Sequence, residues 1–436
     1  MTGRRTRKDR TESNALIRRL SGFTILPLIS ALSPFLLLPI VARLSTQSEW
    51  TVIAVGQSVG AFCGTLVYFG WNIVGPSQIT LARSSEEQVA IYSSSFWSRI
   101  VILVPSALAG CAVTALLSGG QHLELGSLMC LSTLLVGMSG AWYAIGVGSP
   151  RLVATYEVLP RVAGILAAVP TILLLRNAIP YPVILLLTTL IGLVLLNRHL
   201  VGRAFPRWVG WRSAGQSIAS NVVPTLVTSF GSVYTSAPVP LATGLFGATA
   251  VASVTSADKL YRYSLFVVAA LANGLQSWVV GSSKGMFDRR FRASLLAHVV
   301  LGLLGAGGLV VLGDLATSIL FGNELRSGLA PMIGLALAFL SVCTATPFVR
   351  YVLIPLNKNT SVLIANVCGL GIGVLSLLVT LPALGPAGVT MSLGVTEFGT
   401  LVGSMFLAVQ AVRRAQRVGS LINIPIDTDE DLDAVR

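Results

Sequence analysis

The sequence AVASVTSADKLYRYSLFVVAALANGLQSWVV, residues 250–280, decides the class of this protein. About 20 apolar helical residues cross the roughly 30 Å of hydrocarbon in a bilayer, and this stretch exceeds that length. Yet Asp258, Lys259 and Arg262 lie about 12–18 Å from its start, close to the midplane. Each charge facing lipid there would cost about 2.5–3.5 kcal/mol, whereas a Leu or Val returns only about 0.3–0.6 kcal/mol. The charged residues must therefore face other helices or a water-filled cavity.

A helical projection separates the polar residues of this stretch from most of its leucines and valines. One stripe contains Thr255, Asp258, Lys259, Arg262, Asn273 and Gln276. Asp258 can pair with Arg262 one turn later, which leaves Lys259 formally uncompensated. Two interpretations stay open: a structural ion pair that joins helices, or an intramembrane substrate-binding site with a net positive charge.

Composition extends the membrane assignment to the whole chain. Of its 436 residues, 53% are hydrophobic and only 11% are charged, and the mean hydropathy is +0.79. A soluble globular domain carries about 25% charged residues. The chain is therefore predicted to be an all-α polytopic membrane protein. Its net charge of +13 lies largely in short loops and the amino-terminal arm, which indicates a topology signal and argues against a nucleic-acid partner.

The reactive residue types form no pattern of a catalytic or metal site. The five cysteines are odd in number and lie in apolar stretches, and the three histidines are scattered. A nucleophile elbow, a P-loop and an H-E-x-x-H motif are all absent from the sequence. The sequence therefore predicts no metal, no cofactor and no enzymatic activity.

Twelve transmembrane helices are predicted from the apolar windows. These are residues 20–42, 50–71, 96–117, 123–147, 152–175, 181–196, 221–245, 250–280, 293–320, 329–356, 362–381 and 387–411. Residues 1–19 form a cytoplasmic basic arm, and residues 412–436 an acidic, disordered cytoplasmic tail. A basic amphipathic linker, 198–220, is predicted to lie on the cytoplasmic membrane surface. It divides the chain into lobes of six helices each, 20–197 and 221–411.

The distribution of charge predicts the orientation of these helices. The outer connections hold only Arg43, Arg176 and Arg326, whereas the basic clusters lie in the inner connections. Both termini are therefore predicted to be cytoplasmic, in a cell membrane. A shift of about 201 residues places Pro39-Ile40 on Pro240-Leu241 in the same orientation. Parallel repeats of this kind are typical of transporters.

Several segments resemble the polysaccharide flippases of the MOP superfamily. These are Pro39-Ile40-Val41-Ala42-Arg43-Leu44, Tyr68-Phe69-Gly70-Trp71-Asn72, Ser256-Ala257-Asp258-Lys259-Leu260, Leu320-Phe321-Gly322 and Leu384-Gly385-Pro386-Ala387-Gly388-Val389. The resemblance implies a MOP/MATE-like fold, with two six-helix lobes around a central, often cationic cavity. It also implies that Arg43, which matches the family arginine after Pro-x-x-Ala, contributes to substrate binding. The chain departs from the family pattern at Asp258, an acid beside the bases.

Three further polar positions lie inside predicted helices. Glu157 and Arg161 are one turn apart and form either a local ion pair or a gate between the lobes. Glu397 lies near the middle of the last helix and is either a protonatable coupling residue or a buried neutral carboxyl. Arg99 and Arg350 lie near inner helix ends and are expected to extend towards the headgroups.

The leading hypothesis is a flippase for a polyprenyl-pyrophosphate-linked oligosaccharide, working by alternating access in surface polysaccharide biosynthesis. Basic side chains supply charge-assisted hydrogen bonds to a pyrophosphate, while the polyprenyl chain stays in the bilayer. Its partners would be that glycan, the lipid bilayer, and a glycan polymerase or glycosyltransferases. One alternative is a MATE-like exporter of drugs or cations, for which Asp258 and Glu397 argue. A membrane glycan polymerase or ligase is disfavoured because the outer connections are short.

Overall fold

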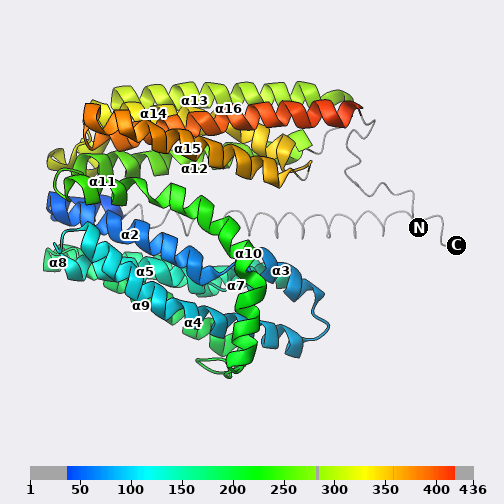
Figure 1. Ribbon diagram of the computed structural model, residues 1–436. Coiled ribbons are helices and arrows are strands. Elements are labelled where there is room, and N and C mark those ends of the chain that lie inside the picture. Colours follow the sequence, from blue (N-terminus) through cyan, green and yellow to red (C-terminus); the bar gives the residue numbers. More distant parts are fainter. Residues whose placement is uncertain (1–36, 281–283, 357, 418–436) are drawn as a thin grey trace, which may run out of the picture. The chain divides into compact units, whose positions relative to one another are not determined.

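A computed structural model describes residues 37–280, 284–356 and 358–417, and all regular secondary structure in these ranges is helical (Figure 1). The chain forms two compact units, which are described separately. The first comprises residues 1–255 with 319–325, and the second comprises residues 256–318 with 326–436. The predicted all-α class is confirmed. The basic arm 1–19 and the end of the acidic tail lie outside the described residues.

The helices account for most of the predicted spans. The elements are α2 (Gln47–Tyr68), α3 (Trp71–Leu81), α4 (Ser85–Leu117), α5 (Leu123–Leu134), η1 (Leu135–Met138), α6 (Ala141–Val147), α7 (Pro150–Val153), η2 (Ala154–Val158), α8 (Leu159–Leu175), α9 (Pro180–Val201), α10 (Trp211–Ser236), α11 (Pro238–Phe246), α12 (Ala252–Val280), α13 (Lys284–Phe321), η3 (Asn323–Leu325), α14 (Leu329–Phe348), η4 (Val349–Leu353), α15 (Asn359–Leu384) and α16 (Ala387–Arg417).

Ten helical stretches in the described ranges are long and apolar enough to cross a membrane. Each matches one of the twelve predicted spans. Of the other two, 20–42 lies largely outside the described residues, although residues 37–44 are helical. The other, 221–245, falls on α10 and α11. The orientation of the termini stays a prediction.

The first unit is built on close contact between α2 and α5. Gly56, Gly60 and Gly64 repeat every four residues along one face of α2. A Cβ added at Gly56 would lie 2.6 Å from the carbonyl oxygen of Gly126, and one at Gly64 would lie 3.3 Å from that of Leu134. Small residues at this spacing let membrane helices approach closely, so the glycines set the distance between the two helices.

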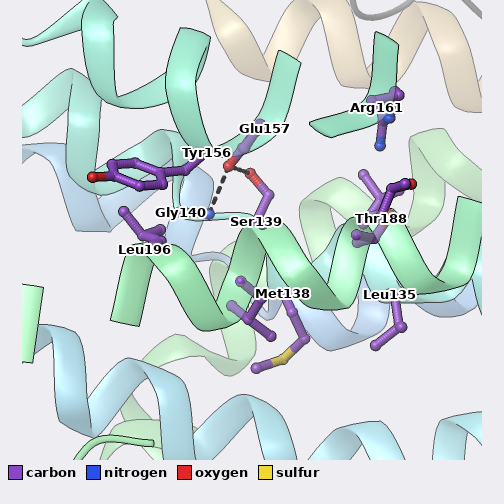
Figure 2. A pocket seen from close by; sticks show the side chains of 13 residues that line it. Leu135, Met138, Ser139, Gly140, Tyr156, Glu157, Arg161, Thr188 and Leu196 are labelled. Atoms are coloured by element: carbon purple, nitrogen blue, oxygen red, sulfur yellow. Dashed lines mark hydrogen bonds between the residues drawn. The ribbon is translucent and has the colours of Figure 1, made fainter. Parts of the chain in front are cut away.

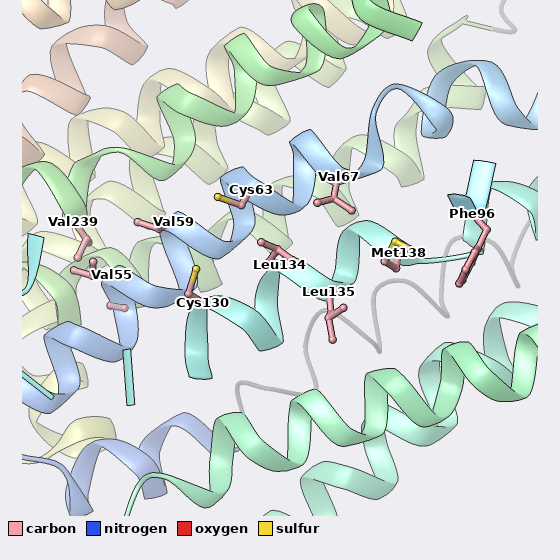
Figure 3. Close-up of a cluster of buried hydrophobic side chains, with 11 residues drawn as sticks. Val55, Val59, Cys63, Val67, Phe96, Cys130, Leu134, Leu135, Met138 and Val239 are labelled. Atoms are coloured by element: carbon pink, nitrogen blue, oxygen red, sulfur yellow. The ribbon is translucent and has the colours of Figure 1, made fainter. Parts of the chain in front are cut away.

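An apolar cluster fills the space beside this contact (Figure 3). Its members come from five elements and are Ala54, Val55, Val59, Cys63, Val67, Phe96, Cys130, Leu134, Leu135, Met138 and Val239. Val239 belongs to α11, which therefore packs in the first unit. α10 also packs on α2, where the Thr65 hydroxyl donates to Ser232 Oγ at 3.0 Å. The division into units thus falls later in the chain than the predicted linker 198–220.

Prolines interrupt the seventh predicted span between α10 and α11. The helix is interrupted at Ala237, directly before Pro238. Pro238 and Pro240 have no backbone N–H and cannot continue the α-helical hydrogen bonds to the preceding turn. Hydrogen bonding resumes where the Leu241 N–H donates to the Ala237 carbonyl at 2.9 Å.

The second unit depends on glycine contacts of α16 with α14 and α15. A Cβ at Gly369 of α15 would lie 2.7 Å from the carbonyl oxygen of Thr396 and 2.8 Å from the amide nitrogen of Thr400. The Ser392 hydroxyl donates to the Gly373 carbonyl at 2.6 Å. Gly334 of α14 approaches the backbone of α16 in the same way. Small residues therefore replace large apolar ones at these helix interfaces, as expected in a membrane.

Candidate functional site

The polar stripe of α12 contains the predicted ion pair. Arg262 Nε donates to Asp258 Oδ2 at 2.6 Å across one helical turn. The Asp258 side chain is 3% exposed and that of Arg262 is 34% exposed. Asp258 Oδ1 is buried without a hydrogen-bond partner in the described part of the chain. Lys259, next in sequence, is also buried. The cluster therefore concentrates one acid and two bases within about one turn of helix.

The last span adds an acid to the surroundings of this cluster. Tyr261 is buried and lies in electrostatic contact with Glu397 of α16, as well as with Asp258 and Arg262. Counting Glu397, the formal charges around Tyr261 and its neighbours balance. The net positive charge predicted for the site stays a prediction, and Glu397 adds a formal negative charge that a count over one helix does not include.

A second polar position lies further along α12. Arg350 Nη1 donates to Asn273 Oδ1 at 2.6 Å, and the Tyr351 hydroxyl donates to the Ala272 carbonyl at 2.9 Å. Arg350 and Tyr351 belong to η4, a π-helical turn that continues α14. Arg350 is thus bound to α12, an interaction that the expectation of a headgroup contact missed. Gln276 is exposed one turn beyond Asn273.

Arg43 has a structural partner at the end of α13. Its guanidinium Nη2 donates to the carbonyl of Ile319, while the Gln47 side chain donates to the Glu324 carbonyl at 3.0 Å. Trp50 packs on Phe321 with ring centroids 5.1 Å apart. A cation is favourable where the last carbonyls of a helix lack partners. The role of Arg43 in substrate binding stays a prediction.

Glu157 supports a break in the fourth span. The helix ends at η1, and α6 begins only after Ser139 and Gly140. Glu157 Oε1 accepts hydrogen bonds from Ser139 Oγ at 2.6 Å and from the Gly140 N–H at 2.8 Å (Figure 2). A carboxylate at this point satisfies amide groups that the break releases at the start of α6.

Arg99 supports the other side of the same break. Its side chain is fully buried and donates to the carbonyls of Ser139 at 2.8 Å and of Gly137 at 3.3 Å. The guanidinium also lies over Trp142, 5.9 Å from the ring centroid. The expectation that Arg99 extends to the headgroups is wrong, because the interrupted helix provides carbonyl acceptors inside the protein. The sequence signal is the Ser139-Gly140 pair within an apolar span.

The break borders a small pocket of about 70 Å³ with a mostly apolar lining. Its polar lining comes from Ser139, Glu157, Arg161, Thr188 and Thr189. This volume has room for a few water molecules. Figure 2 shows Arg161 apart from Glu157, whose Oε1 faces Ser139 and Gly140. The two residues predicted to pair thus share one pocket, and the carboxylate binds the helix break.

Removing the Glu157 carboxylate should destabilise the first unit. Glu157→Ala leaves the Ser139 hydroxyl and the Gly140 N–H without their acceptor, and a hydrogen bond to a charged group contributes about 1.5–3 kcal/mol. We expect a clear drop in the thermal unfolding midpoint of the detergent-solubilised protein, and a smaller drop for Glu157→Gln, which keeps an acceptor. The matched control is Glu124→Ala, since Glu124 is exposed on α5. Equal midpoints for Glu157→Ala and Glu124→Ala would contradict the assignment.

Sequence comparisons do not place the chain in a family. No family model matches it, and no curated protein matches it. Among the residues that the structure describes, no three His, Cys, Asp or Glu side chains gather into a metal site.

Comparison of folds with solved structures does find similar proteins. One is an inward-facing multidrug resistance MATE family transporter of the MOP superfamily, with 14% identity over 88% of this chain and 98% of that chain and a TM-score of 0.57. Another is a mutant of the Vibrio cholerae MATE transporter VcmN, with 15% identity over 94% of this chain and 98% of that chain and a TM-score of 0.50. The chain therefore has the fold of MATE transporters of the MOP superfamily, as the sequence predicted.

Proposed function

We propose that the protein is a flippase that moves a polyprenyl-pyrophosphate-linked oligosaccharide across the membrane. The observation that carries the proposal is the row of bases along α12. Along the axis of α12, Arg350 binds Asn273 at one position, and Arg262 and Lys259 lie at another. Arg262 and Asn273 are about 16 Å apart along the helix at 1.5 Å per residue. A phosphate group moving through the membrane would thus meet two successive basic positions.

The balance of charge favours an anionic substrate over a cationic one. Among the polar residues described above in the second unit, the bases Lys259, Arg262 and Arg350 outnumber the acids Asp258 and Glu397. In the pocket of the first unit and the helix break beside it, the two bases Arg99 and Arg161 outnumber the acid Glu157. Arginine binds phosphate oxygens through two parallel hydrogen bonds, and lysine acts as a point charge. A pyrophosphate would supply the negative charge that compensates the additional bases.

The fold provides the means of movement in this proposal. MATE-like proteins of this fold are transporters by the descriptions of the solved structures. Alternating access requires elements that bend, and both the α10–α11 interruption at Pro238 and the break at Ser139 supply one. Glu157 and Glu397 are the acids that could couple transport to protons or cations, since both lie inside spans.

The second candidate function is export of drugs. It is supported by the multidrug resistance transporter among the similar structures and by Asp258, a buried acid with one carboxylate oxygen lacking a hydrogen-bond partner in the described chain. A cationic drug would bind that oxygen. This candidate requires cations to be attracted despite Lys259 and Arg262 beside it.

Deletion of the gene separates the two functions. A flippase mutant should lose surface polysaccharide and accumulate the lipid-linked intermediate on the cytoplasmic side, with unchanged drug sensitivity. A plasmid copy of the wild-type chain should restore the polysaccharide. Unchanged polysaccharide together with increased drug sensitivity would reject the flippase and support the exporter.

A further inference from the structure

The segment between α9 and α10, residues 202–210, is held in place against α4. The Trp97 Nε1–H donates to the carbonyls of Pro206 at 3.2 Å and Arg207 at 3.0 Å. The Asn197 side-chain amide donates to the Ala204 carbonyl at 2.7 Å. These bonds fix the backbone of a segment that has no regular secondary structure. Side chains projecting from it are therefore presented in a defined arrangement.

Aromatic rings form a continuous row along this segment. Phe205 packs on Phe96 with ring centroids 6.3 Å apart, and Trp208 packs on Trp97 at 4.9 Å. Trp211, at the start of α10, lies 5.0 Å from Trp208. Despite these contacts, Phe205 is 60% exposed, Trp208 is 44% exposed and Trp211 is 74% exposed. The row thus presents a large apolar surface outside the helix bundle.

Arginines flank the row, and the sequence around them contributes no acid. We call the whole set the arginine–aromatic surface, and its members are Arg203, Phe205, Arg207, Trp208, Trp211 and Arg212. All three arginines are exposed. The sequence contains no Asp or Glu from Arg198 up to Asp258, so no acid of the linker or of α10 opposes them. The surface is therefore both apolar and strongly cationic.

We propose that the arginine–aromatic surface binds the phosphodiester headgroups of anionic phospholipids. The surface lies where the candidate span of α9 ends and beside Phe96, where the predicted span 96–117 begins, and we expect the end of a membrane-crossing helix to lie at headgroup depth. Tryptophan favours that depth, and guanidinium groups pair with phosphate oxygens. Exposed rings of this size in water would be unfavourable, whereas the acyl region beside the headgroups accommodates them. The three exposed arginines favour anionic over zwitterionic lipid. This proposal is independent of the transported substrate.

Fluorescence quenching by brominated lipids tests the proposal with the full-length protein in nanodiscs. Brominated phosphatidylglycerol in a phosphatidylcholine bilayer should quench tryptophan more strongly than brominated phosphatidylcholine at the same mole fraction. The triple variant Arg203→Gln/Arg207→Gln/Arg212→Gln should lose the excess quenching by brominated phosphatidylglycerol. Each basic residue near an anionic surface raises lipid affinity roughly fivefold. The matched control, Arg83→Gln/Arg151→Gln/Arg413→Gln, removes the same charge from three other exposed arginines and should leave the excess unchanged.

Two further measurements identify which tryptophans and which ligand cause the excess quenching. Trp208→Phe/Trp211→Phe should abolish the excess quenching, and its persistence would place the lipid elsewhere and overturn the proposal. Millimolar inorganic pyrophosphate should leave the excess unchanged, whereas competition would show that the arginines form a site for soluble phosphates. Equal quenching by the two brominated lipids in the wild-type protein, or equal loss in both triple variants, would also overturn it.

Discussion

Lys259→Gln should reduce export of the lipid-linked glycan roughly 10- to 100-fold while the amount of protein in the membrane stays normal. A hydrogen bond to a charged group contributes about 1.5–3 kcal/mol, and the proposed site gives that bond to the pyrophosphate. Lys259 is buried, so its charge acts at short range and with little screening by water. Surface polysaccharide, normalised to membrane protein level, is the measurement. Lys358→Gln, which removes an exposed lysine, is the matched control.

Arg262→Gln and Asp258→Asn distinguish a substrate site from a structural pair. At a substrate site, Arg262→Gln should impair export severely and Asp258→Asn mildly, because the latter leaves Arg262 available to phosphate. If the pair is only structural, the two variants should be equally harmful through lost protein, since each removes one charge of the 2.6 Å contact within α12. Lys259→Gln would then be nearly silent. Normal export by Lys259→Gln at a normal protein level would remove the pyrophosphate site.

Gly373→Val should prevent stable folding of the second unit, whereas Gly371→Val should be tolerated. A Cβ at Gly373 would collide with the Thr396 side chain and lie 3.3 Å from the Ser392 carbonyl oxygen. At Gly371, two residues away in the same helix, no heavy atom lies within 4 Å of the added Cβ. Overpacking of this kind costs about 1–3 kcal/mol or more, because two backbones must separate.

The two glycine variants change helix propensity equally, so the difference between them isolates packing. We expect Gly373→Val to give little monodisperse protein in detergent and a strongly lowered unfolding midpoint. Gly371→Val should resemble the wild type in both measurements. If the two variants behave alike, the close approach of α15 and α16 is not what stabilises this unit.

The sequence by itself determined the class of the protein and the positions of ten spans. Apolar runs of sufficient length can only be membrane helices, and this follows from local composition. The Asp258–Arg262 pair was equally predictable, because both residues lie on one helix at a spacing of four. Each of these features depends on residues close together in sequence.

Only the tertiary structure decided which residues, distant in sequence, contact the charged side chains. Arg99 binds carbonyls 38 and 40 residues away, and Arg350 binds Asn273, 77 residues away. Glu397 acts on Tyr261 of another span. Helical periodicity gives the face on which a side chain lies but not the helix that covers this face. In a membrane nearly every span is apolar, so hydrophobic pattern alone cannot choose its neighbour; close glycine contacts and the hydrogen bonds of buried polar groups make that choice.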